Sequence, residues 1–460
     1  QGGGSLVAGT LLSSLGVTGN VTLNSGSNLI AEVATFHVVS GDFLLTDASA
    51  VTFSTSVSAQ RISVTDTAAG TAITLNGAMG ATTSLALNAS AGGITQAGSA
   101  TITTPLLLSG GAGGAVDLAG TANAIDAIGA FSVLAGDFHL VDAAALTVNG
   151  PLQVQAGNAV ISDTAAGTAI AVAGSIAASG TVSLTAGHGV LVNTASPAIA
   201  LGAGSVITAA DVALFSTDTG HSLAIDQADG SIIRGVGTGA TASGDVRLTS
   251  TGNQITTLDA FNVTGGSLSL TDATALTIAS AGGPPARVAA NNVTLTMVGA
   301  GARGDVAITG DMVVPGTLTI TTNGTIQRSG GAFVVGTLTG NAVTLADFGT
   351  GANLTNLGQF TVTGSEFVLG NAQPLTITGP LSAEFFRITA TGSMTLAGNI
   401  TTLGETRAQQ GLGNITFAGS DAALANPLPA QGSYLAVVGT DGPASFTQSA
   451  PVTISTAGGD

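Results

Sequence analysis

The chain has 460 residues, of which 68 are Gly and only 7% are charged, and it contains no Cys, Trp or Lys. The formal net charge of −17 argues against nucleic acid and an anionic membrane surface as partners, because both attract clustered basic residues. The lack of Cys excludes a disulfide scaffold and a thiolate metal site. The 44% apolar content is nevertheless ample for a core, so we expect a folded protein.

Two features bear on targeting. Gly, Ser, Thr or Asp interrupts every apolar run well short of the ~18 residues that a spanning helix needs, so we expect no direct membrane insertion. The chain begins with Gln1 and shows no signal-peptide pattern. We therefore expect it to be a processed or excised piece of a longer precursor.

One eighteen-residue segment occurs four times along the chain, each time beginning at a Phe. Within each copy, apolar residues alternate with period two in three short stretches, which is the pattern of strands and not of helices. In the first copy these stretches lie around residues 36–38, 43–45 and 51–53. The four copies are FHVVSGDFLLTDASAVTF from Phe36, FSVLAGDFHLVDAAALTV from Phe131, FNVTGGSLSLTDATALTI from Phe261 and FTVTGSEFVLGNAQPLTI from Phe360.

Between the second and third stretches, each copy carries one Asx residue followed by Ala. An Asx side chain accepts hydrogen bonds from backbone amides two residues on, so this pattern predicts a tight corner. The alternative is a calcium ladder, but one carboxylate in each copy does not supply the several converging oxygens that calcium needs. We therefore predict no metal site and no cofactor. The four corner residues are Asp47, Asp142, Asp272 and Asn371.

Two further elements repeat. The segment TDTAAGTAI at 65–73 recurs as SDTAAGTAI at 162–170. An Asn also precedes the Phe of each copy, at Asn28, Asn123, Asn253 and Asn353. Looser strand patterns closed by Gly, Asn or Asp fill the remainder, and no stretch shows a capped helical stripe.

Short, regularly spaced strands suit either a sandwich or barrel, or a parallel β-solenoid. The solenoid is favoured because the pattern continues through residues 1–420, and because hairpin signals such as Asn-Gly are missing between the repeated stretches. We predict an all-β parallel β-helix with about three strands in each coil and roughly twenty coils, taking roughly 20–25 residues for each coil. Its internal modules begin near residues 36, 131, 261 and 360. Residues 421–460 are a C-terminal cap, a linker or a continuation of the solenoid.

Parallel β-helices include enzymes that act on polysaccharides, so an enzymatic function is one possibility for this fold. Such sites need convergent carboxylates, usually with a basic residue, whereas this chain has no Lys and no Asp-Asp pair in sequence. The tripeptide GHG at 187–189 is similar to part of the polygalacturonase signature, but the paired aspartates and basic triplet of that family are missing, so we interpret His188 as a turn residue. The other histidines, His37, His139 and His221, lack metal-ligand spacing. We predict no catalytic residues and no enzyme.

One short motif suggests recognition. Arg303, Gly304 and Asp305 resemble the integrin-binding tripeptide of animal adhesion ligands. In a Gly-rich chain this triplet also fits an ordinary turn with a solvated Arg and Asp.

The motif GDFxLxDAxxLTV, the stretch TLTGNAV at 337–343 and the frequent LT, VT and SL pairs resemble the repeat region of filamentous-haemagglutinin-like bacterial exoproteins, of two-partner secretion and autotransporter type. The resemblance implies a right-handed β-helical rod outside the cell that acts in adhesion, biofilm or contact-dependent antagonism. The lack of Cys agrees with passage, unfolded, through an outer-membrane pore. The Asn-Pro-Asn-Gly-type motifs of the family's secretion domain are not seen.

From the residues and the resemblance together, we expect an extracellular or cell-surface structural rod of a bacterial adhesin or biofilm-matrix fibre, without catalysis. Its expected partners are itself, as a homopolymer or as neighbouring repeats of a longer chain, and a host or bacterial cell-surface glycan or receptor. The main alternative is a self-assembling subunit of an extracellular filament or surface layer, because a solenoid ends in open strand edges. A polysaccharide-acting β-helix enzyme is a minor alternative.

Overall fold

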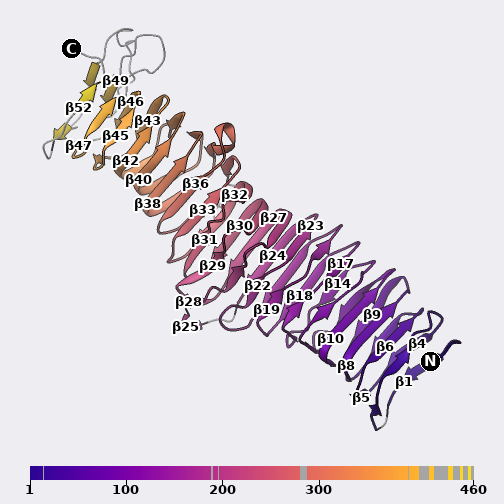
Figure 1. Ribbon diagram of the computed structural model, residues 1–460. Helices are drawn as coiled ribbons and strands as arrows, with labels where there is room; N and C mark the ends of the chain where they lie inside the picture. Colours follow the sequence, from indigo (N-terminus) through magenta and orange to yellow (C-terminus); the bar gives the residue numbers. More distant parts are fainter. Residues whose placement is uncertain are drawn as a thin grey trace. The chain divides into compact units, whose positions relative to one another are not determined.

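The computed structural model is 60% strand and 1% helix, and its parallel stacked strands form a β-solenoid of about 17 turns (Figure 1). It describes residues 1–13, 15–187, 190–194, 196–279, 287–391 and 393–402, together with the strands at 414–418, 434–438, 446–448 and 454–456. The chain divides into two compact units, Gln1–Gly244 and Asp245–Asp460. The predicted all-β solenoid is confirmed.

Unit 1 consists of strands joined by short turns. Its elements are β1 (Val7–Leu11), β2 (Val17–Thr18), β3 (Val21–Leu23), β4 (Leu29–Val33), β5 (Phe36–Ser40), β6 (Phe43–Asp47), β7 (Val51–Phe53), β8 (Val57–Asp66), β9 (Gly70–Leu75), β10 (Met79–Ala89), β11 (Gly92–Gln96), β12 (Ile102–Thr104), β13 (Leu107–Leu108), β14 (Val116–Leu118), β15 (Ala124–Ile125), β16 (Ala127–Ile128), β17 (Phe131–Val133), β18 (Phe138–Asp142), β19 (Leu146–Val148), β20 (Leu152–Val154), β21 (Ala159–Asp163), β22 (Ile170–Val172), β23 (Ser175–Ala178), β24 (Thr181–Ala186), β25 (Val190–Thr194), β26 (Ile199–Leu201), β27 (Val206–Ser216), β28 (Thr219–His221), β29 (Leu223–Gln227) and β30 (Ile232–Thr241).

Unit 2 is built in the same way and adds one 3-10 turn. Its elements are β31 (Asp245–Leu248), β32 (Gln254–Val263), β33 (Leu268–Asp272), β34 (Leu276–Ile278), β35 (Val288–Ala289), β36 (Val293–Met297), η1 (Gly301–Gly304), β37 (Val306–Ile308), β38 (Met312–Thr322), β39 (Thr325–Arg328), β40 (Phe333–Ala342), β41 (Leu345–Asp347), β42 (Asn353–Val362), β43 (Glu366–Asn371), β44 (Leu375–Ile377), β45 (Leu381–Ala383), β46 (Phe385–Ala390), β47 (Met394–Leu396), β48 (Ile400–Thr402), β49 (Asn414–Ala418), β50 (Tyr434–Val438), β51 (Phe446–Gln448) and β52 (Ile454–Thr456).

Strands stack in parallel on the strands of the next coil. In unit 1, β4 pairs with β7, while β5 and β6 pair with the two halves of β8, so one coil has three sides. Coil length varies: Phe43 pairs with Ile62, 19 residues on, and Leu276 pairs with Val306, 30 residues on. Because the longer coils exceed the length assumed from the sequence, the solenoid has about 17 turns where roughly twenty were predicted.

The core is a narrow column of inward-facing residues. Strands such as β6 and β18 alternate buried and half-buried positions, as the sequence predicts. Each fully buried Leu, Val or Phe contributes roughly 1.5–3 kcal/mol. In three copies the leading Phe also contacts the Phe seven residues on, across the corner between two sides. The ring centroids are 5.0 Å apart for Phe36 and Phe43, 5.1 Å for Phe131 and Phe138, and 4.9 Å for Phe360 and Phe367.

The repeated modules do not repeat after a whole number of turns. In unit 1, the residues that stack on Phe36 in successive coils lead to the position of Asn123 in the second module. They do not lead to Phe131, the residue that corresponds to Phe36 in sequence. In unit 2, the residues that stack on Phe261 lead in the same way to the position of Asn353 in the fourth module and not to Phe360. Within each unit, successive modules are therefore turned by about one side of the coil. The pairs are Phe36–Val57, Val57–Met79, Met79–Ile102 and Thr103–Ala124 in unit 1, and Phe261–Val288, Val288–Met312, Met312–Phe333 and Val334–Asn353 in unit 2.

Part of the C-terminal segment, 421–460, also pairs with coils. Strands β50, β51 and β52 pair in parallel with β49, β47 and β48. The rest of this segment lies outside the described residues, and its role as cap, linker or continuation stays a prediction. Among the described residues, no helix is long and apolar enough to cross a membrane.

Candidate functional site

The predicted corner residues hold two successive coils together. The Asp47 Oδ1 accepts a hydrogen bond from the Ala48 amide at 2.8 Å and, two residues on as predicted, from the Ser49 amide at 3.4 Å. Its Oδ2 accepts a further bond, from the Ile30 amide of the preceding coil, at 2.9 Å. The sequence pattern does not predict this further bond. The same link, to an amide 17 residues earlier, joins Asp142 to Ile125 at 3.1 Å, Asp272 to Ile255 at 2.7 Å and Asn371 to Leu354 at 2.7 Å.

The upstream Asn of the first three copies completes this corner from the other side. The Asn123 Nδ2 donates to the Val141 carbonyl at 2.9 Å, and its Oδ1 accepts from the Ile102 amide at 2.8 Å. The corresponding donors in the other copies are Asn28 to Thr46 at 3.0 Å and Asn253 to Thr271 at 3.1 Å. We call each Asn–Asp set a corner clasp: Asn28 with Asp47, Asn123 with Asp142, and Asn253 with Asp272. All six side chains are buried.

The fourth copy corrects the sequence alignment. Asn353 is exposed, and the clasp position is instead occupied by Ala352, whose carbonyl accepts a bond from the Ala372 amide at 2.6 Å. Both members of the clasp differ in this copy. Ala352 takes the place of the Asn, and Asn371 takes the place of the Asp. The Asn371 Nδ2 donates to the Leu354 carbonyl and to the Gln373 carbonyl, both at 2.9 Å, so the amide at this corner bonds to other carbonyls than the clasp Asn does in the first three copies.

The structure brings aspartates together that are far apart in sequence. Asp66 pairs in register with Asp47, and Asp163 pairs with Asp142, one coil on in each case. Burial, with the neighbouring carboxylate adding to it, raises the pKa of Asp142 to about 7 and that of Asp66 to about 6. Burial is also the main cause that raises the pKa of Asp163 and of Asp272 to about 6. No Asp-Asp pair is visible in sequence, yet these aspartates lie in register on adjacent coils.

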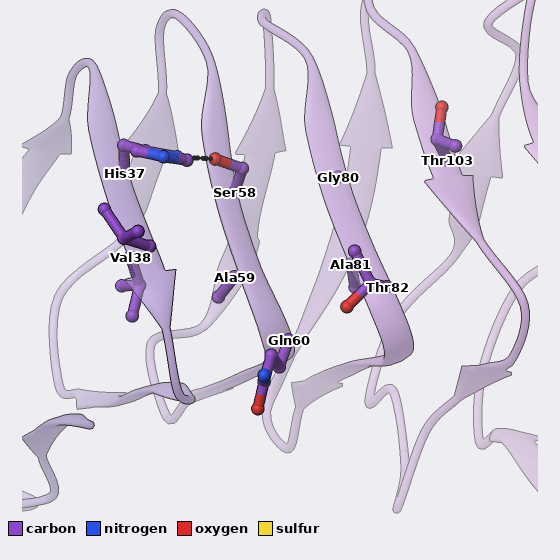
Figure 2. Close-up of a pocket in the computed structure, with 10 residues that line it drawn as sticks. His37, Val38, Ser58, Ala59, Gln60, Gly80, Ala81, Thr82 and Thr103 are labelled. Atoms are coloured by element: carbon purple, nitrogen blue, oxygen red, sulfur yellow. Dashed lines mark hydrogen bonds between the residues drawn. The ribbon is translucent and has the colours of Figure 1, made fainter. Parts of the chain in front are cut away.

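A shallow groove crosses four successive coils of unit 1 on their outer surface (Figure 2). It has a volume of about 350 Å³, and it is lined from β5, β8, β10 and β12. The outward column beneath it runs from His37 through Ser58 and Gly80 to Thr103. Gly80 leaves room in the middle, because a Cβ placed there would meet only the Ser58 Cβ, at 4.0 Å. Gln60 and Thr82 border the groove.

The groove offers uncharged hydrogen-bonding groups. The His37 Nδ1 is hydrogen bonded to the Ser58 hydroxyl, as the dashed line in Figure 2 shows. The residues that line the groove include no carboxylate and no Arg. A Ser–His pair without an orienting third group lacks the parts of a nucleophilic triad. An imidazole, hydroxyls and an amide can instead bind a polar, uncharged ligand such as a sugar.

A second shallow depression, of about 470 Å³, lies in the coils of β14, β18 and β21. In it the His139 Nδ1 lies 2.9 Å from the Asp117 Oδ1, and both side chains are well exposed. The buried His221 lies 3.3 Å from Asp218 through its Nε2. His188 lies outside the described residues. Within the described part of the chain, no group of three or more His, Asp or Glu could hold a metal ion.

The predicted adhesion tripeptide lies at the end of η1. Arg303 is exposed, but Gly304 is buried, and a Cβ at Gly304 would come within 2.8 Å of the Gly299 carbonyl oxygen. The Asp305 Oδ1 accepts bonds from the Thr325 amide at 2.7 Å and the Thr325 hydroxyl at 2.8 Å. The carboxylate of the tripeptide is thus engaged by the next coil.

Unit 2 also displays two adjacent columns of polar side chains, two residues apart on each strand. Within one column, the Thr319 and Thr339 hydroxyls are hydrogen bonded at 2.9 Å. The columns are Ser269, Thr294, Thr319 and Thr339, and Thr271, Thr296, Thr321 and Asn341. Their spacing along the chain is irregular, although their register in space is regular.

The chain was compared with protein-family models, with curated proteins and with solved structures, and none of the three comparisons returned a match.

Proposed function

We propose that this chain is a non-catalytic structural segment of a bacterial surface adhesin or biofilm-matrix fibre, located outside the cell. The observation that carries the proposal is the stacking of parallel coils joined by buried clasps. Each added coil lengthens the stack by about 4.8 Å, so length is gained without a new core design. The sequence resemblance to filamentous-haemagglutinin-like repeats supports the same function.

A cell-surface glycan is the partner that best fits the outer surface. The groove over Gly80 and the hydroxyl columns of unit 2 present donors and acceptors without charge. Such groups hydrogen bond to sugar hydroxyls and do not require a charged ligand. We therefore assign first contact with a glycan to the groove.

Removing the protein from its bacterium and restoring it in two forms tests this function. We expect the deletion to lower attachment or biofilm mass, and the native chain to restore it. Gly80→Leu fills the groove at a position with open space, so this variant should reach the cell surface and restore attachment poorly. Protease treatment of intact cells followed by immunoblotting measures surface display. A chain that stays protected inside the cell, or a deletion without effect, contradicts the proposal.

Self-assembly end to end is the second candidate, and a specific observation favours it. The first coil exposes large apolar side chains: Leu15 is 95% exposed, Val7 71% and Leu12 59%. Burying each of them against a further coil, either of a longer chain or of a second copy, contributes roughly 1.5–3 kcal/mol. Electron microscopy of the purified chain separates the two proposals, because a subunit gives filaments of indefinite length and a segment gives particles of one length.

A further inference from the structure

Two copies of the same arrangement stand out in unit 1. Asp66 and Asp163 are the second residues of the repeated segments TDTAAGTAI and SDTAAGTAI, and each is stacked on a corner aspartate of the preceding coil. We call these sets the acid pairs: Asp47 with Asp66, and Asp142 with Asp163. Both pairs are buried, with each side chain 0–1% exposed. The duplicated segment thus duplicates a pair of stacked carboxyl groups.

The hydrogen bonds within each pair are unequal. Asp47 accepts backbone amide bonds at both carboxylate oxygens. Asp66 and Asp163 accept an amide bond at Oδ1, from Ala68 and Ala165, both at 2.6 Å. Their Oδ2 atoms are buried and make no bond within hydrogen-bond geometry, although the backbone amides of Val51 and Leu146 also approach the two carboxylates and oppose the rise in pKa. A buried carboxylate oxygen without a donor is costly when charged, and much less so when it carries a proton.

Among the described residues, no basic group acts on the pKa of either acid pair to offset its two carboxylates. On the following coil, Ala89 pairs with Asp66. Ala186 pairs with Asp163, and Ser216 pairs with Ala186 one coil further on. The charged group that acts on Asp163 is a third carboxylate, Asp218, which is itself paired with His221 at 3.3 Å. Stacked strands are about 4.8 Å apart, so two ionised aspartates in adjacent coils repel each other strongly in this environment.

We infer that each acid pair holds one shared proton in mildly acidic solution, and that loss of this proton to solvent as the pH rises through neutrality loosens the coils that the pair joins. The acid pairs are then a pH-sensitive latch built into the solenoid. This role does not depend on the glycan partner or on the location of the protein.

The direction of the pH effect follows from proton binding in the two states. An unfolded aspartate loses its proton near pH 4. The folded pairs keep theirs until higher pH, since burial and the neighbouring carboxylate raise the pKa of Asp142 to about 7 and that of Asp66 to about 6. Between these values the folded state binds more protons, so stability is greatest in acid and falls as pH rises to about 7. This is the opposite of ordinary acid denaturation.

Calorimetric melting at pH 5, 6, 7 and 8 tests the latch in the full chain. For the native protein we expect a Tm at least about 4 °C lower at pH 8 than at pH 5. The double variant Asp66→Asn with Asp163→Asn keeps the shape and removes one carboxyl group from each pair, so its Tm should rise at pH 8 and fall less steeply with pH than that of the native chain. The control, Asp126→Asn with Asp229→Asn, makes the same charge change at exposed sites and should follow the native profile.

A native Tm that stays level or rises from pH 5 to pH 8 overturns the inference. So does a double variant whose Tm falls as steeply as that of the native chain. If the double variant does not fold, infrared spectroscopy of the native chain decides. At pH 6 exposed carboxyl groups are ionised, so a protonated carboxylic-acid band that disappears by pH 8 is expected. Absence of that band at pH 6 contradicts a shared proton.

Discussion

At the residue scale, hydrogen bonds of buried amide and carboxyl side chains connect the coils of this protein, which has few charged residues. Asn123 accepts bonds from the Gln96 side chain at 2.7 Å and from the Ile102 amide at 2.8 Å, and it donates to the Val141 carbonyl. One side chain therefore links successive coils. With only 7% charged residues, the chain depends on such buried polar bonds for the register of its corners.

Asn123→Ala should lower the free energy of unfolding by about 2–4 kcal/mol, because it removes the hydrogen bonds of Asn123 to the buried Gln96 side chain, to the Ile102 amide and to the Val141 carbonyl. Asn76→Ala is the matched control, because Asn76 is exposed on the same unit, and it should change stability by less than about 0.5 kcal/mol. Urea unfolding followed by circular dichroism measures both. Equal effects of the two substitutions would show that the clasp contributes nothing.

The sequence identified the corner residues but only half of their bonds. An Asx residue before a turn predicts the bond to the amide two residues on, as Asp272 makes to Thr274. The bond of Asp47 to Ile30 crosses to another coil, and coil length cannot be read from a module spacing that covers several coils. For the same reason, nothing in the sequence indicated that Asp66 lies on Asp47 or that Ala352, not Asn353, occupies the fourth clasp position.

At the element scale, bulges absorb the differences in coil length. Strands β27 and β30 lose register between Thr208 and Asp211, so that Ala209 and Ala210 both lie opposite Gly235. Gly235 has φ +138°, and a Cβ there would come within 2.4 Å of the Ala209 carbonyl oxygen. Only Gly fits this position, since it has neither the steric strain nor the clash.

Gly235→Ala should cost about 2–4 kcal/mol of stability, from the unfavourable φ and the contact with the Ala209 carbonyl. Gly98→Ala is its control in the same unit, because a Cβ at Gly98 meets nothing within 4 Å. The control should be neutral or stabilise by up to about 1 kcal/mol. Thermal melting of the two variants tests whether the bulge requires Gly235. If the Gly235→Ala protein is as stable as the Gly98→Ala protein, this requirement is ruled out.

Strand positions were predictable where alternation is strict, as in β6, β18 and β33, which carry the repeated Phe or Leu positions. The features of the outward surfaces could not be predicted from the sequence. The Ser and Thr residues that form columns in unit 2 are 20 or 25 residues apart, as Ser269, Thr294, Thr319 and Thr339 show. An irregular spacing in sequence becomes a regular column only after each coil has closed. The groove over Gly80 was missed for the same reason.

At the scale of the whole molecule, the composition has a simple physical explanation. Parallel coils satisfy backbone donors and acceptors through the next coil, so solubility and stability require few charges. The overall class could be predicted because period-two alternation continues from module to module. The number of turns could not be predicted, since it depends on insertions. One such insertion separates Met394 from its partner Phe446, 52 residues on.

Cysteine cross-linking tests the coil register most directly, because the native chain has no Cys. Thr52 pairs with Thr74 in unit 1, and Ser269 pairs with Thr294 in unit 2. Paired Cα atoms lie about 4.8 Å apart, within disulfide range, whereas residues two coils apart are separated by about 9–10 Å. On mild oxidation, the variants Thr52→Cys with Thr74→Cys and Ser269→Cys with Thr294→Cys should form intramolecular disulfides. The variants Thr52→Cys with Thr95→Cys and Ser269→Cys with Thr319→Cys should not. Cross-linking of the two-coil pairs, or none in the adjacent pairs, would contradict the stacked parallel coils on which this account depends.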